Sequence, residues 1–212
     1  SARRCTAWFN RTNKEQRNPF LPFAMINESI VTMSVITQRG DSGETDLMYG
    51  RRVSKTHPRI VANGSVDELN AVLGVARTQA RLEDFANLES RLSTLQNQLI
   101  LAMGEIATAI EDRPRYAKDG FATLSPKEHE SLTNEAKQLE QDLDSRFKDW
   151  AIPGSQGPLT CAHLDHARTL CRRAERDVLS ITDAAVTLQH LVVYLNRMSD
   201  FLWLNARFVE RL

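Results

Sequence analysis

The chain has 212 residues, 42% of them hydrophobic and 25% charged, which suits one globular domain with a full core. Lysine plus arginine and aspartate plus glutamate both total 27, so the formal net charge is zero. A general nucleic-acid or membrane-surface binder is normally basic, so this balance counts against both classes. No apolar run approaches the roughly 20 residues that cross a bilayer, and the three cysteines make no disulfide framework. We therefore expect a cytoplasmic protein with free thiols.

Residues 1–33 differ in composition from the rest of the chain. Before Asn27 they carry one acid, Glu15, against the basic residues Arg3, Arg4, Arg11, Lys14 and Arg17. They lack the apolar segment of a secretory signal. A vector remnant, translated upstream sequence and a basic targeting arm all remain open. We expect a mostly disordered, non-functional extension over 1–33 and a folded domain over 34–212.

The first half of the folded domain predicts two helices. Ser65 to Glu68 matches a capping box, with serine at the cap and glutamate three residues later, so a helix is expected to run from Val66 to about Arg81. A second helix carries apolar residues at three- and four-residue steps from Leu88 to Ile110 and should end before Pro114. The stretch 114–124 lacks periodicity and is predicted to be a loop.

The second half predicts three more helices. Ser125 to Glu128 is another capping box, and the helix that it starts should run to about Lys148. A loop rich in proline and glycine follows over 150–158, then helices over about 159–181 and from about Asp183 to the C-terminus. Five long helices with short connections indicate an all-α, up-and-down bundle, ferritin-like in appearance.

A glycine-punctuated segment precedes the bundle. Residues 35–59 show no helical period, and 37–46 are dense in hydroxyls around Gly40 and Gly43. Glycines let backbone N–H groups turn towards an anion, so this loop could hold phosphate, with Lys55 as a further contact. It is not a Walker A sequence. The alternative interpretation of these residues is a surface turn with a solvated lysine.

Four arginines stand within the predicted helix at 167–176: Arg168, Arg172, Arg173 and Arg176. Arg168, Arg172 and Glu175 share one helix face, and like charges stacked this way repel. Guanidinium groups suit phosphate oxygens, so a bound anion would offset that repulsion. A solvated basic face with an internal salt bridge is the plainer alternative, and on this segment alone the better one.

Taken together, these motifs resemble the PduO-type ATP:cob(I)alamin (corrinoid) adenosyltransferases. The resemblance spans about Ser34 to Arg211 in the family's order. It rests on Thr37 with Gly40-Asp41-x-Gly43, Arg52-Val53-Ser54-Lys55, Arg59 to Asn70, Met103 to Ala107, Ile152-Pro153-Gly154, Ala167 to Arg176, and Tyr194-Leu195-Asn196-Arg197-Met198-Ser199-Asp200. The last two motifs are the most specific.

The resemblance implies a homotrimer of five-helix bundles that transfers the 5′-deoxyadenosyl group of ATP to the reduced cobalt of a corrinoid and releases triphosphate. It implies active sites at subunit interfaces, with Mg²⁺ bound mainly through ATP and no protein ligand assigned. By similarity, the ATP-contacting positions are Thr37, Gln38, Arg39, Gly40, Thr45, Asp46, Lys55, Arg172, Arg173, Glu175, Arg176 and Asn196. Asp67 and Arg168 match an ion pair between subunits, and these two residues with Arg172 form the expected catalytic set.

Trp150 stands where the family has a phenylalanine below the corrin, and an aromatic that merely caps the core is the alternative. Arg39, Glu44, Asn63 and Ser155 also depart from the family's usual residues. These departures keep a rival function open: a non-catalytic nucleotide- and corrinoid-binding bundle that acts as a chaperone or regulator. A reductase and an adenosylcobalamin-dependent client enzyme are conceivable protein partners; nucleic acid and membrane are not expected.

Overall fold

The computed structural model describes residues 36, 38–143, 150–184 and 187–212. The chain divides into two compact units, Ser1–Thr37 and Gln38–Leu212, and the second holds nearly all of the described residues. The expectations for residues 1–33 and for Thr37 lie outside the described ranges.

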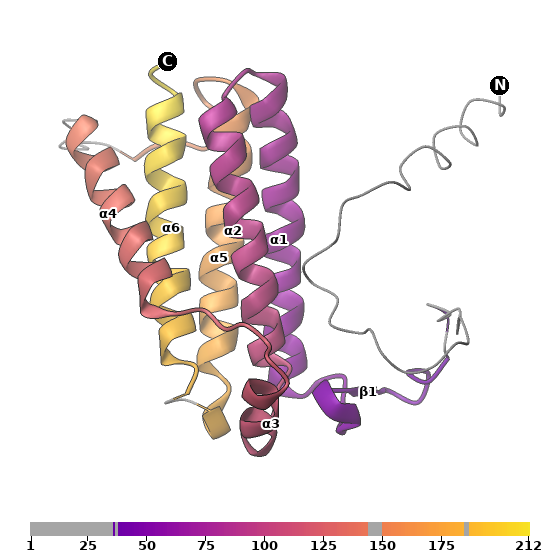
Figure 1. The fold of residues 1–212 in the computed structure, drawn as a ribbon. Coiled ribbons are helices and arrows are strands. Elements are labelled where there is room, and N and C mark those ends of the chain that lie inside the picture. The colour runs from indigo at the N-terminus through magenta and orange to yellow at the C-terminus, as the bar shows by residue number, and fades with distance from the viewer. Residues whose placement is uncertain (1–35, 37, 144–149, 185–186) are drawn as a thin grey trace, which may run out of the picture. The chain divides into compact units, whose positions relative to one another are not determined.

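Five long helices form an up-and-down bundle, as the sequence predicts (Figure 1). Their bounds are α1 Pro58–Leu82, α2 Ala86–Ile106, α4 Pro126–Asp142, α5 Leu159–Leu179 and α6 Gln189–Val209. A short helix, α3 (Arg113–Lys118), follows α2. In the described residues, none of the helices has the length and apolar character that a membrane span requires.

The core follows from the apolar spacing of the helices. On α6, Leu191, Leu195, Met198 and Leu202 recur at three- and four-residue steps, and all four are fully or almost fully buried. The other long helices contribute similar stripes, so one continuous apolar cluster fills the bundle. This cluster packs α5 against both α1 and α6. The packing therefore determines the direction in which the arginine-bearing faces of α5 point.

The expected start of α1 is wrong. The helix begins at Pro58, with His57 as its N-cap, because proline is favoured in the first turn and the His57 Nδ1 atom accepts a hydrogen bond from the Arg59 N–H at 3.2 Å. Ser65 therefore lies inside the helix. Its Oγ atom donates to Asp177 Oδ2 on α5 at 2.5 Å instead of capping a helix end.

Three other helix boundaries differ from the predictions. Helix α2 ends at Ile106, so Ile110 belongs to a separate 3₁₀ turn. Helix α3 occupies part of the stretch predicted to be a loop, because Pro114 stands in its first turn, where proline is tolerated. Helix α6 starts at Gln189, six residues after the predicted start at Asp183. The predicted end of the third long helix, about Lys148, lies outside the described residues.

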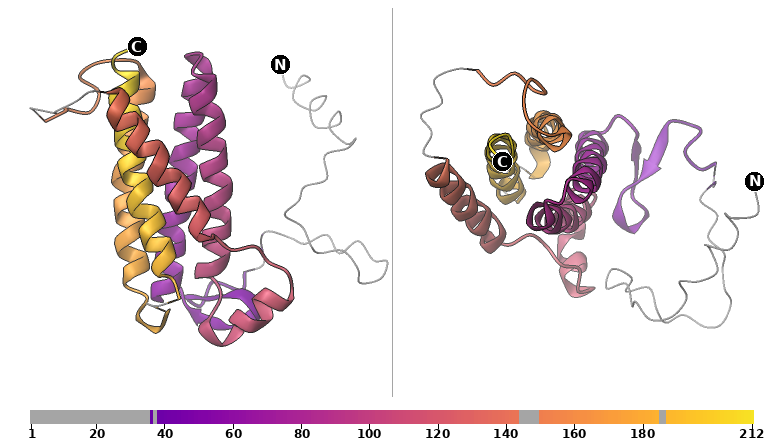
Figure 2. Two further views of the ribbon diagram at one scale, coloured as in Figure 1. Left: turned by 60° about the vertical axis from the view of Figure 1, so that its left-hand side comes forward. Right: turned by 90° about the horizontal axis from the view of Figure 1, so that it is seen from above.

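The segment before the bundle contains a small antiparallel hairpin that the sequence did not indicate. Strands β1 (Glu44–Asp46) and β2 (Arg52–Ser54) pair with Thr45 opposite Val53. Its turn is fastened to the end of α2, where the Met48 N–H donates to the Ala107 carbonyl at 2.9 Å. Seen down the bundle, the hairpin lies on the α1 side, whereas α4 lies on the opposite side (Figure 2).

Candidate functional site

The open end of the hairpin brings Gly40 and Lys55 together. A Cβ atom added to Gly40 would lie 3.0 Å from Lys55 Nζ, so the end of the lysine side chain packs closely against this glycine and would have to shift for a larger residue. The Lys55 N–H also donates to the Gly43 carbonyl at 2.9 Å, across a turn in which Gly43 has a φ of 83°. The ammonium group therefore lies over the glycine turn, where backbone N–H groups can also face an anion.

Arg39 and Asp46 form a second group on the same hairpin. Arg39 Nη2 lies 3.0 Å from Asp46 Oδ2, and Arg52 approaches the other oxygen of Asp46 at 3.4 Å. Arg52 also donates to the Arg39 carbonyl at 3.1 Å. Arg39, one of the departures from the family pattern, thus folds back onto the hairpin instead of extending away from it. Thr45 lies half-buried on β1, and Gln38 is exposed.

Arg168 and Arg172 on α5 border one cavity of about 560 Å³. Helices α4 and α6 complete its lining with Thr133, Ala136, Lys137, Glu140, Arg197, Ser199, Asp200, Trp203 and Leu204. Four of the lining side chains are cationic and two are acidic, and one acid is already paired, since Arg197 lies 2.9 Å from Asp200. The cavity therefore has an excess of positive charge, and its volume is in the range of small-ligand sites.

A buried carboxylate supports Arg168. Asp165, one turn earlier on α5, lies 3.7 Å from Arg168 Nε, and its other oxygen accepts a hydrogen bond from Arg207 at 2.7 Å. Asp165 and Arg207 are both almost fully buried. Because Arg207 also contacts Glu210 at 2.6 Å, the group is a charge network and not an isolated pair. It restricts where the guanidinium of Arg168 can point.

The remaining α5 residues face other directions. Arg173 pairs with Glu68 on α1, and Glu175 accepts a hydrogen bond from Asn196 on α6 at 3.2 Å. Arg176 is exposed. The structure therefore joins Arg168 with Arg172 and Glu175 with Asn196, but it turns Arg173 away from the cavity.

Asp67 is exposed on α1. Within one chain it lies at a different level along the bundle axis from Arg168. The contact between Glu68 and Arg173 fixes the register of the antiparallel helices α1 and α5. Arg168 lies five residues further from this contact, which is about 7.5 Å along the helix axis. The cavity lining includes no residue of the hairpin. Within one chain, the hairpin group and the cavity are thus two separate surfaces.

Trp150 is 98% exposed, so it does not cap the core, which was the alternative interpretation of this residue.

The described residues contain no group of three or more histidine, cysteine, aspartate or glutamate side chains placed to hold a metal ion. Sequence reasoning missed Lys137, Glu140 and Trp203. The one available signal for the first two was their three-residue spacing, which puts them on one face of α4.

The family model described as cobalamin adenosyltransferase matches residues 35–209. The chain belongs to this family. It is 35% identical over 181 residues to the corrinoid adenosyltransferase PduO of Salmonella typhimurium, covering 82% of this chain and 49% of that protein. It is 31% identical to the corrinoid adenosyltransferase of Bacillus subtilis, covering 84% and 87%. The chain thus spans about half the length of the PduO relatives and most of the shorter one.

Solved structures agree with the family assignment. A variant PduO-type ATP:corrinoid adenosyltransferase from Lactobacillus reuteri, complexed with cobalamin and ATP, superposes with a TM-score of 0.72 at 25% identity. The match covers 84% of this chain and 91% of that one. The fold of this chain is therefore similar to that of a PduO-type corrinoid adenosyltransferase over most of both chains.

Proposed function

We propose that this chain is an ATP:corrinoid adenosyltransferase, whose domain runs over 34–212 with 1–33 as an extension. The observation that carries the proposal is the cationic cavity beside Arg168 and Arg172 in a chain of this family. ATP and a reduced corrinoid would be its substrates, and the Lactobacillus reuteri structure named above is a complex with ATP and cobalamin. We place the protein in the cytoplasm, a reducing compartment in which its cysteines would stay free thiols.

The reaction forms a bond between cobalt and C5′ of ATP and breaks the bond between C5′ and its oxygen. Cobalt(I) supplies the electron pair, and triphosphate leaves with the pair of the broken bond, so no general base is required. The difficulty is the negative charge that develops on the leaving oxygen. Arg172 would stabilise this charge from α5, and Lys55 would do so from the hairpin. Lys137, on the α4 side of the same cavity, would add a third cation.

Mg²⁺ would be held mainly through the phosphate oxygens, because it keeps several waters and needs only one or two carboxylates. Glu140 and Asp200 border the same cavity as Arg168 and Arg172 and supply such oxygens, so the residues fit this mode of binding. When bound, the metal would neutralise part of the triphosphate charge. Asp200 is already engaged by Arg197, which leaves Glu140 as the better placed of the two.

The separation of the hairpin from the cavity supports a homotrimer with interfacial sites. Each chain carries both surfaces, so one chain's hairpin can complete a neighbour's cavity around a ring. Asp67 would pair with Arg168 of the next subunit in this arrangement. Apolar side chains along α1 are exposed at seven-residue multiples, at Val61, Val75 and Leu82, and an intersubunit contact would cover them.

The corrin would lie against Trp150, whose exposed ring has no place in the core. An aromatic surface below the corrin would keep the lower axial ligand away from cobalt. Four-coordinate cobalt(II) is easier to reduce, because removing a donor lowers the energy of the orbital that accepts the electron. Trp150 would thus favour formation of the nucleophile without touching the nucleotide.

The direct test is incubation of the purified chain with ATP, Mg²⁺ and chemically reduced cob(I)alamin, with absorbance recording the new cobalt–carbon bond. Arg172→Ala should leave the bundle folded and slow turnover by about 100-fold to 1000-fold, the usual loss for a donor to developing charge. Arg81→Ala, an exposed arginine at the end of α1, is the matched control and should retain activity. Tight ATP and corrinoid binding without turnover would support the non-catalytic alternative instead.

A further inference from the structure

Tyr49 occupies a backbone conformation that its side chain does not favour. It lies in the turn between β1 and β2 with a φ of 65° and a ψ of 21°. This left-handed region is common for glycine and rare for a large residue, because the Cβ atom crowds the backbone. Something outside the turn must therefore hold Tyr49 in place.

The side chain of Tyr49 is held by α3. The Arg115 guanidinium lies over the tyrosine ring, 4.1 Å from its centre, and the Tyr49 hydroxyl donates to Asp119 Oδ2 at 3.0 Å. Next to it, Arg51 Nε donates to Asp112 Oδ2 at 2.9 Å. We call these five residues the α3 clamp. It fastens the turn of the hairpin to one short helix and its two ends.

The charges of the clamp suit its geometry. Desolvation and the hydrogen bond to Asp119 raise the pKa of Tyr49, so its hydroxyl stays a donor throughout the neutral range. The hydrogen bond from Arg51 is the main reason why the pKa of Asp112 is lowered, so that carboxylate stays charged.

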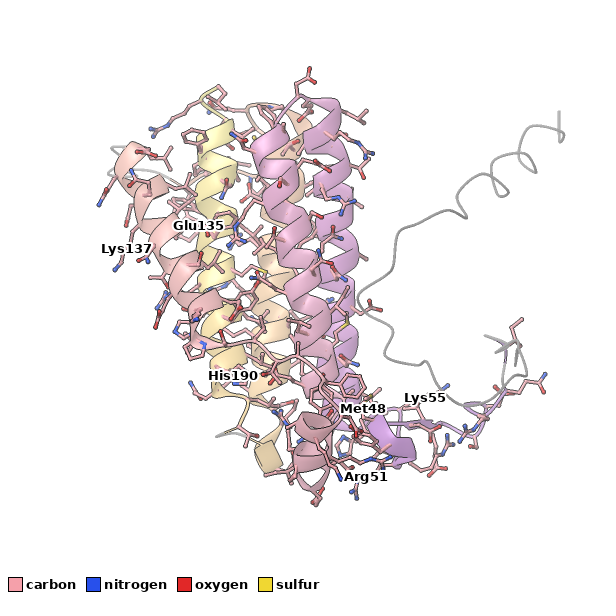
Figure 3. The ribbon with its side chains drawn as sticks, in the orientation of Figure 1. Met48, Arg51, Lys55, Glu135, Lys137 and His190 are labelled. Atoms are coloured by element: carbon pink, nitrogen blue, oxygen red, sulfur yellow. The ribbon has the colours of Figure 1, made fainter. Side chains whose placement is uncertain are left out.

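The clamp and the proposed nucleotide contacts lie at opposite ends of the hairpin. The turn, with Tyr49 and Arg51, contacts α3, and the open end carries Gly40 and Lys55. Figure 3 shows Met48 and Arg51 near the α3 end of the bundle and Lys55 further out on the same segment. Since each strand has only three residues, the pair of strands has little stability of its own. The direction of the hairpin therefore depends on its anchors: the junction of β2 with α1, where the His57 N–H donates to the Ser54 carbonyl at 2.9 Å, and the contacts that hold the turn.

We propose that Tyr49 is a positioning residue for ATP, which holds the hairpin in its nucleotide-binding orientation through the α3 clamp. The inference rests on the proposed function, because it requires Lys55 to contact the nucleotide. Tyr49 itself touches no reacting atom. It acts by raising the fraction of chains whose hairpin is ready to bind, and the apparent affinity rises in proportion to that fraction.

Tyr49→Gly distinguishes two explanations of this turn, one in which only backbone strain matters and one in which the side chain holds the hairpin. Glycine accepts the left-handed backbone freely, so if only strain mattered, the variant would bind ATP as well as the unmodified chain or better. If the side chain holds the hairpin, loss of the ring and the hydroxyl should raise the dissociation constant and the KM for ATP by about threefold to tenfold. The kcat at saturating ATP and the KM for corrinoid should stay within about twofold, because ATP binding restores the orientation.

Calorimetric titration with ATP and steady-state rates provide these numbers, and the far-ultraviolet circular dichroism of each variant checks folding. Tyr49→Phe keeps the ring over Arg115 and loses only the hydroxyl, so its effect should be smaller than that of Tyr49→Gly. Lys118→Ala, an exposed change on the same helix outside the clamp, is the matched control and should bind ATP normally. An unchanged ATP affinity in Tyr49→Gly would overturn the proposal.

Lys55→Ala separates this inference from the proposed function. If Lys55→Ala weakens ATP binding and Tyr49→Gly does not, the positioning role is wrong and the proposed function stands. If neither variant changes ATP binding, the hairpin is not the nucleotide contact, and the inference falls together with that part of the proposed site.

Discussion

Arg59 offers the sharpest test of how the bundle is closed at the hairpin end. Its side chain is only 1% exposed, and its Nη1 atom donates to the carbonyls of Ile106 and Thr108, both at 2.9 Å. Ile106 is the last residue of α2, so its carbonyl has no partner within that helix. Arg59→Met keeps a long apolar stem of similar length but removes both donors. Two buried carbonyl groups then lose their charged partner.

The expected loss follows from these contacts. A hydrogen bond from a charged donor contributes about 1.5 kcal/mol at the low end of its range, so two of them amount to about 3 kcal/mol. The third contact, to Asp183 at 3.0 Å, adds little because Asp183 is 52% exposed and regains water when the arginine is lost. For a chain of this size, the expected drop in Tm is roughly 6–12 °C.

Thermal and urea unfolding followed at 222 nm would measure this loss, at one fixed protein concentration because oligomers unfold in a concentration-dependent way. Asp183→Asn is the comparison variant, since it removes the charge of Asp183 but keeps an oxygen that can accept from Arg59, and both carbonyl contacts remain, so its loss should be clearly smaller than that of Arg59→Met. A loss below about 1 kcal/mol for Arg59→Met, or equal losses for both variants, would refute the assignment of the stability to the two carbonyl contacts.

Two further predictions concern the thiols and the corrin. Burial raises the pKa of Cys161 to about 11 and also raises that of Cys171, so in a Cys5→Ser variant neither thiol should react with a thiol reagent at pH 8 until the protein unfolds. The stability that these neutral thiols contribute should decline as the pH rises from about 9 through 11, and fast labelling of the folded variant would contradict their burial. Trp150→Ala should spare ATP binding and slow the reaction from cobalt(II) more than from cobalt(I), with Trp150→Phe close to normal. Equal losses from both states would show that Trp150 does not control the lower ligand.

Local sequence signals predicted part of the fold well and failed where distant contacts decide. The capping box at Ser125 and Glu128 marks the start of α4, and both of its hydrogen bonds are present. The same pattern at Ser65 marks no helix start, because Pro58 begins α1 earlier and Ser65 bonds to α5. Two strands of three residues are too short to show an alternating pattern, so the hairpin was missed.

For the candidate site too, local spacing predicted some features, and contacts between distant helices decided the others. Helical spacing puts Arg168 and Arg172 on one face, and the structure does place both beside one cavity. Spacing alone could not show that Lys137 of α4 borders the same cavity, because this depends on how α4 packs against α6. Spacing does place Asp165 one turn from Arg168, but it could not show that Arg207 of α6 pairs with this buried carboxylate.

The central claim is an adenosyltransferase whose site combines the hairpin of one subunit with α5 of the next, and mixing two inactive variants tests it most directly. Lys55→Ala damages the hairpin surface and Arg172→Ala damages the cavity surface, so each variant alone should be nearly inactive. If equal amounts are co-expressed and assembled at random, one site in four joins an intact hairpin to an intact α5, and activity should recover to roughly a quarter of the unmodified level. A mixture no more active than the two separate variants would contradict the interfacial site.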